Sequence, residues 1–123
     1  MKNSNWVEAL GHALDGISAT AKTQRNFRIQ IFFAILAVIG CIIFRVEALQ
    51  FILVALAIFF VLAMELVNTA IEAVTDLSCK GEIHPLAKIA KDAAAGAVVL
   101  ASIFAVIVGV VVFLPQVIQF FRA

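Results

Sequence analysis

Long blocks of apolar residues, separated by short polar segments, are the dominant pattern along this chain. Apolar runs occupy about residues 29–44, 48–64 and 93–114. A helix rises about 1.5 Å per residue and a bilayer core is about 30 Å thick, so the third run is a comfortable span and the first two are short ones. We therefore expect one all-α membrane domain, residues 1–123, with three transmembrane helices.

Residues 4–22 carry a different pattern, with apolar residues on one helical face only. Trp6, Leu10, Ala13, Leu14 and Ile17 recur at helical spacing, and the opposite face carries Glu8, His12, Asp15 and Lys22. Asn5, with Glu8 three residues later, is suited to cap the start. The pattern predicts a surface helix in the membrane interface, with Trp6 at the headgroups. The alternative is a helix buried against the bundle.

The polar segments predict the connections and the orientation. Residues 45–47 form a tight turn, residues 77–92 read as a polar loop with Gly81 and Pro85 as breakers, and Pro115 follows the third run. Seven basic residues fall on one side of a three-span arrangement and two on the other, namely Lys2, Lys22, Arg25, Arg28, Lys80, Lys88 and Lys91 against Arg45 and Arg122. This predicts a multi-pass membrane protein, with its N-terminus and the loop at residues 77–92 in the cytoplasm.

Composition agrees with a membrane protein and excludes several other classes. The chain is 64% hydrophobic and 14% charged, whereas a soluble domain is about half apolar and a quarter charged. A net charge of +1 without a basic patch gives no sign of a nucleic-acid partner. Cys41 and Cys79 fall at different depths, so we expect neither a disulfide nor a zinc site. The first apolar run begins too late for an ordinary signal peptide, so we expect no cleaved leader.

A row of polar side chains at the inner end of the second span is the strongest functional signal. At about 100° per residue, Glu65, Glu72 and Asp76 lie within roughly 40° of one another, with Asn68 about 60° to one side. Carboxylates at the edge of hydrocarbon are costly unless something compensates them. Glu72 and Asp76 are suitable oxygen ligands for magnesium, and a deeper Glu65 is suited to act as a general base. Lys91-Asp92 begins the third span at a similar depth, where the lysine could meet phosphate.

Three readings of this acidic face differ in function. In the first, the chain is an enzyme that acts at the water–lipid boundary. In the second, it is a transporter or channel subunit whose acids handle protons or cations. In the third, the acids only fix helix packing in an accessory membrane protein, by pairing with Lys22, Arg25, Arg28 and Lys91. The chain has no Gly-rich nucleotide loop, so any nucleotide site must be built from helix faces and loops.

Three segments resemble the small prokaryotic diacylglycerol kinases, a family that includes the undecaprenol kinases of Gram-positive bacteria. They are Glu65-Leu-Val-Asn68-Thr-Ala-Ile-Glu72-Ala-Val-Thr-Asp76, Arg25-Asn-Phe-Arg28, and His84-Pro-Leu-Ala-Lys-Ile-Ala-Lys91-Asp92-Ala-Ala-Ala-Gly96-Ala. The resemblance covers nearly the whole chain. It implies a homotrimer of three-span subunits that transfers the γ-phosphoryl group of MgATP to a lipid hydroxyl, in an active site shared between subunits.

The resemblance also implies roles for individual residues. Glu65 would be the general base, with Asn68 beside it as a second catalytic residue. Glu72 would bind magnesium, and Gln24 stands where the family usually has a second acidic ligand. The positions that match nucleotide contacts are His12, Gln24, Glu72, Asp76, Glu82, Ile83, His84, Lys91 and Asp92. The positions that match the lipid region are Arg25, Phe27, Arg28 and Glu65.

Two points stay open at the level of sequence. Gln24 retains an amide oxygen but brings no charge, so we predict weaker metal binding and slower turnover, whether the residue is natural or engineered. The acceptor lipid is either diacylglycerol or undecaprenol. The Arg25–Arg28 segment and the segment that begins at His84 look more like the Gram-positive branch, in which undecaprenol is often preferred.

Overall fold

The computed structural model describes residues 5–123, which form four α-helices joined by short connections. The helices are α1 (Trp6–Thr23), α2 (Arg25–Ile43), α3 (Ala48–Cys79) and α4 (Pro85–Arg122). Within this described part, α2, α3 and α4 are each long and apolar enough to cross a membrane. The predicted architecture of one amphipathic helix followed by three spans is therefore confirmed. Residue 4 of the predicted surface helix lies outside the described residues.

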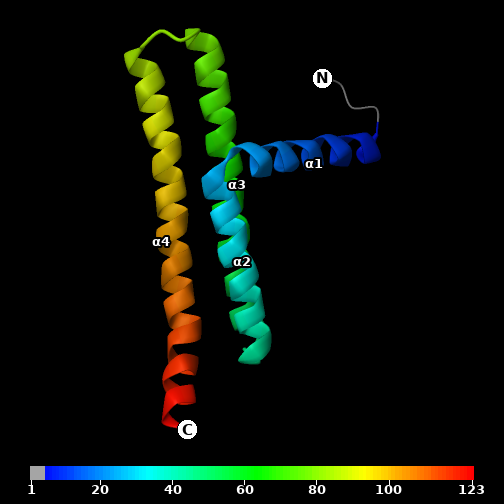
Figure 1. Cartoon of the computed structure of the whole chain (residues 1–123), viewed down its shortest axis with the longest axis vertical. Coiled ribbons are helices and arrows are strands. Elements are labelled where there is room, and N and C mark those ends of the chain that lie inside the picture. The colour runs from blue at the N-terminus through cyan, green and yellow to red at the C-terminus, as the bar shows by residue number, and fades with distance from the viewer. Residues whose placement is uncertain (1–4) are drawn as a thin grey trace.

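Helix α1 projects sideways from the other three helices (Figure 1). The Glu8 amide donates a hydrogen bond to Asn5 Oδ1 at 2.9 Å, so the predicted N-cap is present. The apolar stripe of α1 is exposed, from 90% for Trp6 to 41% for Ile17, and Thr20 is its one buried residue. This arrangement favours the interfacial helix over a helix packed inside its own bundle.

The junction between α1 and α2 is a single extended residue, Gln24. The last carbonyls of a helix lack partners within that helix. Here the Arg28 guanidinium donates to the carbonyl oxygens of Ala21 and Lys22, at 2.9 and 3.1 Å. Arg28 therefore ties the end of α1 to the first turn of α2 and fixes the direction in which α1 leaves the bundle.

Helices α3 and α4 form a long antiparallel pair that extends past the level of α1 (Figure 1). With 32 and 38 residues, they are about 48 and 57 Å long, well beyond a bilayer core of about 30 Å. The polar ends of both helices therefore continue outside the membrane. Helix α4 also runs through Pro115 to Arg122 instead of ending at residue 114.

The predicted polar loop at residues 77–92 is wrong over most of its length. Helix α3 continues to Cys79 and α4 already begins at Pro85, so the connection is the short turn 80–84. Proline is well suited to the first turn of a helix, where its missing N–H is not needed. His84 caps this helix by accepting a hydrogen bond from the Leu86 amide at Nδ1. Lys80 and Gly81 make the turn with positive φ angles of 49° and 83°.

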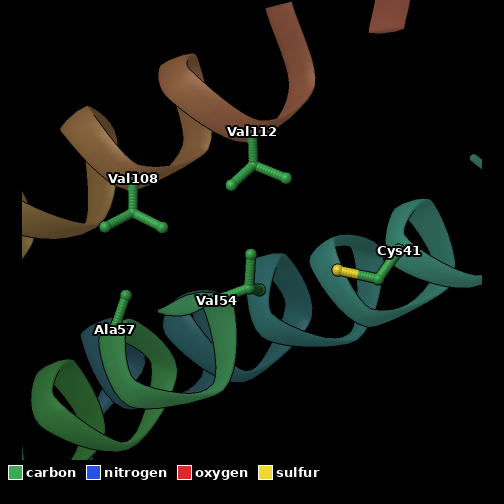
Figure 2. Packing of buried hydrophobic residues seen from close by; sticks show 5 residues of the cluster. All are labelled: Cys41, Val54, Ala57, Val108 and Val112. Carbon is green, nitrogen blue, oxygen red and sulfur yellow. The ribbon is translucent and has the colours of Figure 1, made fainter. Parts of the chain in front are cut away.

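The small core joins all three spans at the level shown in Figure 2. Cys41 of α2, Val54 and Ala57 of α3, and Val108 and Val112 of α4 are buried against one another. Close to this core, a Cβ atom on Gly40 would lie 3.0 Å from the Phe113 ring, so glycine lets α2 approach α4. Most other apolar side chains face outward. In a membrane these faces meet lipid or another subunit. Both cysteines are free.

Candidate functional site

Glu65 lies in the middle of α3 and is only 4% exposed. Its two carboxylate oxygens are held by different amides. Gln30 Nε2 of α2 donates to Oε1 at 3.0 Å, and Asn68 Nδ2 donates to Oε2 at 3.2 Å. A buried charge is normally paired with an opposite charge, but the described residues place no cation against this one. The two amides therefore hold Glu65 as a hydrogen-bond acceptor without neutralising it.

Asn68 joins Glu65 to the next acid along the same helical face. Its amide nitrogen also donates to Glu72 Oε1, at 3.0 Å. Residues three and four apart on a helix are neighbours, so one side chain can bridge two carboxylates at i−3 and i+4. The sequence grouped these three side chains on one face, and the structure connects them directly.

Gln30 is a site residue that the sequence reasoning did not identify. It reaches Glu65 from another helix, 35 positions away in the chain. The signal for it was present, because Gln30 is the one side chain with nitrogen or oxygen in the apolar run 29–44. A lone polar residue within a span usually faces other helices or a cavity.

Two amide oxygens beside Glu65 have no hydrogen-bond partner among the described residues. They are Gln30 Oε1 and Asn68 Oδ1, and both atoms are buried. An unsatisfied buried acceptor costs about 1–3 kcal/mol. Buried acceptors without a hydrogen-bond partner, on both sides of a buried carboxylate, are typical of a site that binds a polar group.

An apolar groove of about 600 Å³ lies between α2, α3 and α4, and Gln30 forms part of its wall. Gln30 and Ser102 are the two lining side chains that carry nitrogen or oxygen, and the others are apolar. Phe44 and Phe113 lie in the lining near the opposite end of α2. The groove is thus suited to a hydrocarbon chain whose polar end reaches Gln30 and Glu65.

Nearer the turn between α3 and α4, Asp76 and Lys91 come together across the two helices. Lys91 Nζ lies 2.5 Å from Asp76 Oδ1, and both side chains are partly exposed. The hydrogen bond with Asp76 raises the pKa of Lys91, which precedes the apolar segment of α4, so this lysine remains a cation at neutral pH. A second, exposed ion pair joins Lys88 to Asp92 within α4. The third reading expected four cations on the acidic face, and within the described residues Lys91 alone makes such a pair.

Glu72 and Gln24 lie at about the same level of the bundle. Along α2, Gln24 lies about 9 Å before Gln30, and along α3, Glu72 lies about 10 Å beyond Glu65. Both distances start from the contact between Gln30 and Glu65. No three His, Cys, Asp or Glu side chains gather as a metal site in the described part of the chain. Magnesium is often held by one or two carboxylates together with phosphates and water. Glu72, beside the open Asn68 Oδ1, fits such a partial set of ligands.

The remaining predicted site residues are spread over the chain. Glu82, Ile83 and His84 are exposed in the turn between α3 and α4. Arg25 is exposed on the first turn of α2, and Phe27 is buried inside the chain at 2% exposure. His12 is exposed on α1, about 18 Å along that helix from Gln24. Because α1 points sideways, one chain does not bring His12 to the acidic face (Figure 1).

These features define an integral membrane protein with a buried, amide-held carboxylate beside an apolar groove and a charged hairpin at one end of α3 and α4. A sequence model of the family described as prokaryotic diacylglycerol kinase matches residues 11–113. The chain belongs to this family, whose named members are lipid kinases.

Individual relatives give the same result. The chain is 44% identical over 111 residues to a diacylglycerol kinase of Synechocystis, covering 90% of this chain and 63% of that protein. It is 40% identical over 113 residues to an undecaprenol kinase of Bacillus subtilis, covering 92% and 91%. It is 34% identical over 101 residues to a diacylglycerol kinase of Escherichia coli, covering 82% of each. The chain thus spans less than two thirds of the Synechocystis protein and most of the other two.

Proposed function

We propose that this protein phosphorylates the hydroxyl group of a membrane lipid with MgATP, and that Glu65 is the general base. The observation that carries the proposal is Glu65 itself, a buried carboxylate with no cation partner among the described residues, placed next to a groove of apolar side chains. A general base must be an acceptor within reach of the proton that it removes. Both amides beside Glu65 leave its oxygens free to accept a further hydrogen bond.

The lipid would enter sideways from the bilayer, with its hydrocarbon chain in the groove and its hydroxyl group at Glu65. ATP would arrive from the cytoplasmic side, where the hairpin of α3 and α4 extends beyond the membrane. The two substrates would then meet at the level of Asn68 and Glu72. Phosphoryl transfer depends mainly on positioning and charge neutralisation, and so it suits a site made from helix faces.

The nucleotide end would use the charged residues of the hairpin. Lys91 is a cation held in place by Asp76, and it is suited to contact phosphate oxygens. Asp92 and the turn residues Glu82, Ile83 and His84 would contribute further nucleotide contacts. A bound magnesium ion would neutralise phosphate charge, and Glu72 and Gln24 are the residues that would hold it. The distance of His12 from this face supports a homotrimer in which a neighbouring subunit supplies α1.

The acceptor is proposed as a lipid with a terminal hydroxyl at the interface, which describes both diacylglycerol and undecaprenol. Relatives named for each lipid match this chain at similar identity. The segments around Arg25 and His84 favour undecaprenol on the basis of resemblance. Either product would leave phosphate on the cytoplasmic face of the bacterial inner membrane.

The test is phosphoryl transfer from labelled ATP by the purified protein in lipid vesicles, with the two acceptors assayed in parallel. A labelled lipid product that depends on magnesium would support the kinase and name its substrate. The Glu65→Gln variant is the control for the base. If neither lipid is labelled while sealed vesicles show proton-coupled flux, the transporter reading replaces the proposal.

A further inference from the structure

Gln30 and Glu65 form a side-chain hydrogen bond that joins α2 to α3 in the middle of α3. Gln30 is also part of the groove wall. One side chain therefore touches both the candidate base and the space through which a lipid would reach it. No other residue among those described combines these two contacts.

The geometry around Glu65 limits the orientations that its carboxylate can adopt. Asn68 holds Oε2 from the same helix, and Gln30 holds Oε1 from α2. With one donor on each oxygen, the plane of the carboxylate is set by both helices together. Without Gln30, Oε1 would have no donor among the described residues, and Glu65 could turn toward Asn68 alone.

We propose that Gln30 is a positioning residue that holds Glu65 in the orientation required to accept the proton of the lipid hydroxyl. This inference rests on the proposed role of Glu65 as general base. The unpaired Gln30 Oε1 supports it, because a residue kept only to join two helices would be expected to satisfy both ends of its amide. Gln30 acts through Glu65, so removing it should slow the chemical step and leave nucleotide binding unchanged.

The alternative is a hydrogen bond that only stabilises the packing of α2 on α3. A positioning role and a packing role predict different activities when Gln30 and Glu65 are substituted together. If Gln30 acts through Glu65, its loss matters little once Glu65 can no longer accept a proton. If Gln30 only stabilises the fold, the effects of the two substitutions are independent and add.

The experiment uses the full-length protein in lipid vesicles, with labelled ATP and whichever acceptor the wild type phosphorylates. Gln30→Met keeps the length and shape of the side chain and removes the donor. Its kcat should fall by roughly ten- to a hundredfold, with KM for ATP unchanged. Gln30→Asn keeps a shorter amide and should recover part of this loss. Ile35→Met is the matched control, since Ile35 is exposed on α2 and lies outside the groove lining.

Two results would overturn the proposal. One is an unchanged kcat in Gln30→Met. The other is a Gln30→Met/Glu65→Gln double variant whose loss of kcat, relative to the wild type, equals the product of the two separate losses. The double variant is expected to be no slower than Glu65→Gln.

A spectroscopic measurement that does not require catalytic activity tests the Gln30–Glu65 contact independently of the proposed function. In protein with ¹³C-labelled glutamate, the Glu65 carboxyl resonance, assigned by its loss in Glu65→Gln, should move in Gln30→Met and stay in place in Ile35→Met. An unmoved resonance overturns the contact on which the inference stands. If the wild type phosphorylates neither lipid, the proposed function fails and the positioning role fails with it, while a moved resonance shows that the hydrogen bond itself is real.

Discussion

Lys91 of α4 and Asp76 of α3 form an ion pair at 2.5 Å across the hairpin that joins the two helices. Both side chains are partly exposed, so the pair contributes little to stability by itself. Its position is more informative, because it fixes a cation beside the acidic face, above the level of Glu72. A cation held in this way is suited to receive the phosphates of a nucleotide.

The first prediction concerns this lysine. Lys91→Met should raise KM for ATP by about tenfold, equivalent to about 1.4 kcal/mol, because a phosphate contact is lost. KM for the lipid should not change. Steady-state kinetics with each substrate varied in turn would measure both constants. Lys88→Met is the matched control, since Lys88 makes a similar exposed ion pair within α4.

A charge-reversed double variant separates binding from structure at the same position. In Asp76→Lys/Lys91→Asp the ion pair can form again with its partners exchanged. If the pair only holds the hairpin together, this variant should regain a normal KM for ATP. A KM that stays high agrees with a phosphate contact by Lys91.

The second prediction concerns the base. Glu65→Gln keeps the size of the side chain but cannot accept a proton, so kcat should fall by about 10²- to 10⁴-fold. ATP binding, measured by calorimetry, should survive. Loss of ATP binding would instead indicate a structural role for Glu65. Glu47→Gln is a suitable control, because Glu47 caps the far end of α3 and its replacement can still accept the capping hydrogen bond.

Much of the fold could be predicted from hydropathy, because a bilayer requires long apolar helices whose backbone groups are satisfied internally. The ends of α3 and α4 at the hairpin could not be predicted, for a local reason. Gly81 and Pro85 are both typical helix breakers, although Pro85 lies where α4 starts and only residues 80–84 form the turn. A proline at the first position of a helix and a proline in a loop look alike in sequence.

The candidate site, like the fold, could be predicted only in part from the sequence. Helical periodicity placed Glu65, Asn68 and Glu72 on one face, and the structure connects them through Asn68. Periodicity within one helix carries no information about the neighbouring helix. The contact between Gln30 and Glu65 depends on how α2 packs on α3, and the choice of Lys91 as partner of Asp76 depends on the register of α4.

The third prediction tests the position of Gln24. Gln24→Glu adds a negative charge at the level of Glu72, so the magnesium concentration for half-maximal activity should fall by about tenfold. Turnover at low magnesium should rise. Activity measured against free magnesium, at constant ATP, gives both values. An unchanged magnesium dependence would remove Gln24 from the proposed metal site.

The fourth prediction concerns the junction of α1 and α2. Arg28→Met removes two hydrogen bonds to the last carbonyls of α1, and should lower stability by about 1 kcal/mol. Thermal unfolding in detergent would measure the loss. Since α1 would also lose its fixed direction, spin-label distances between α1 and α3 should broaden. Arg25→Met is the control at an exposed neighbouring position. Unchanged stability and distances would show that Arg28 does not hold the junction, and would leave contact with lipid as its proposed role.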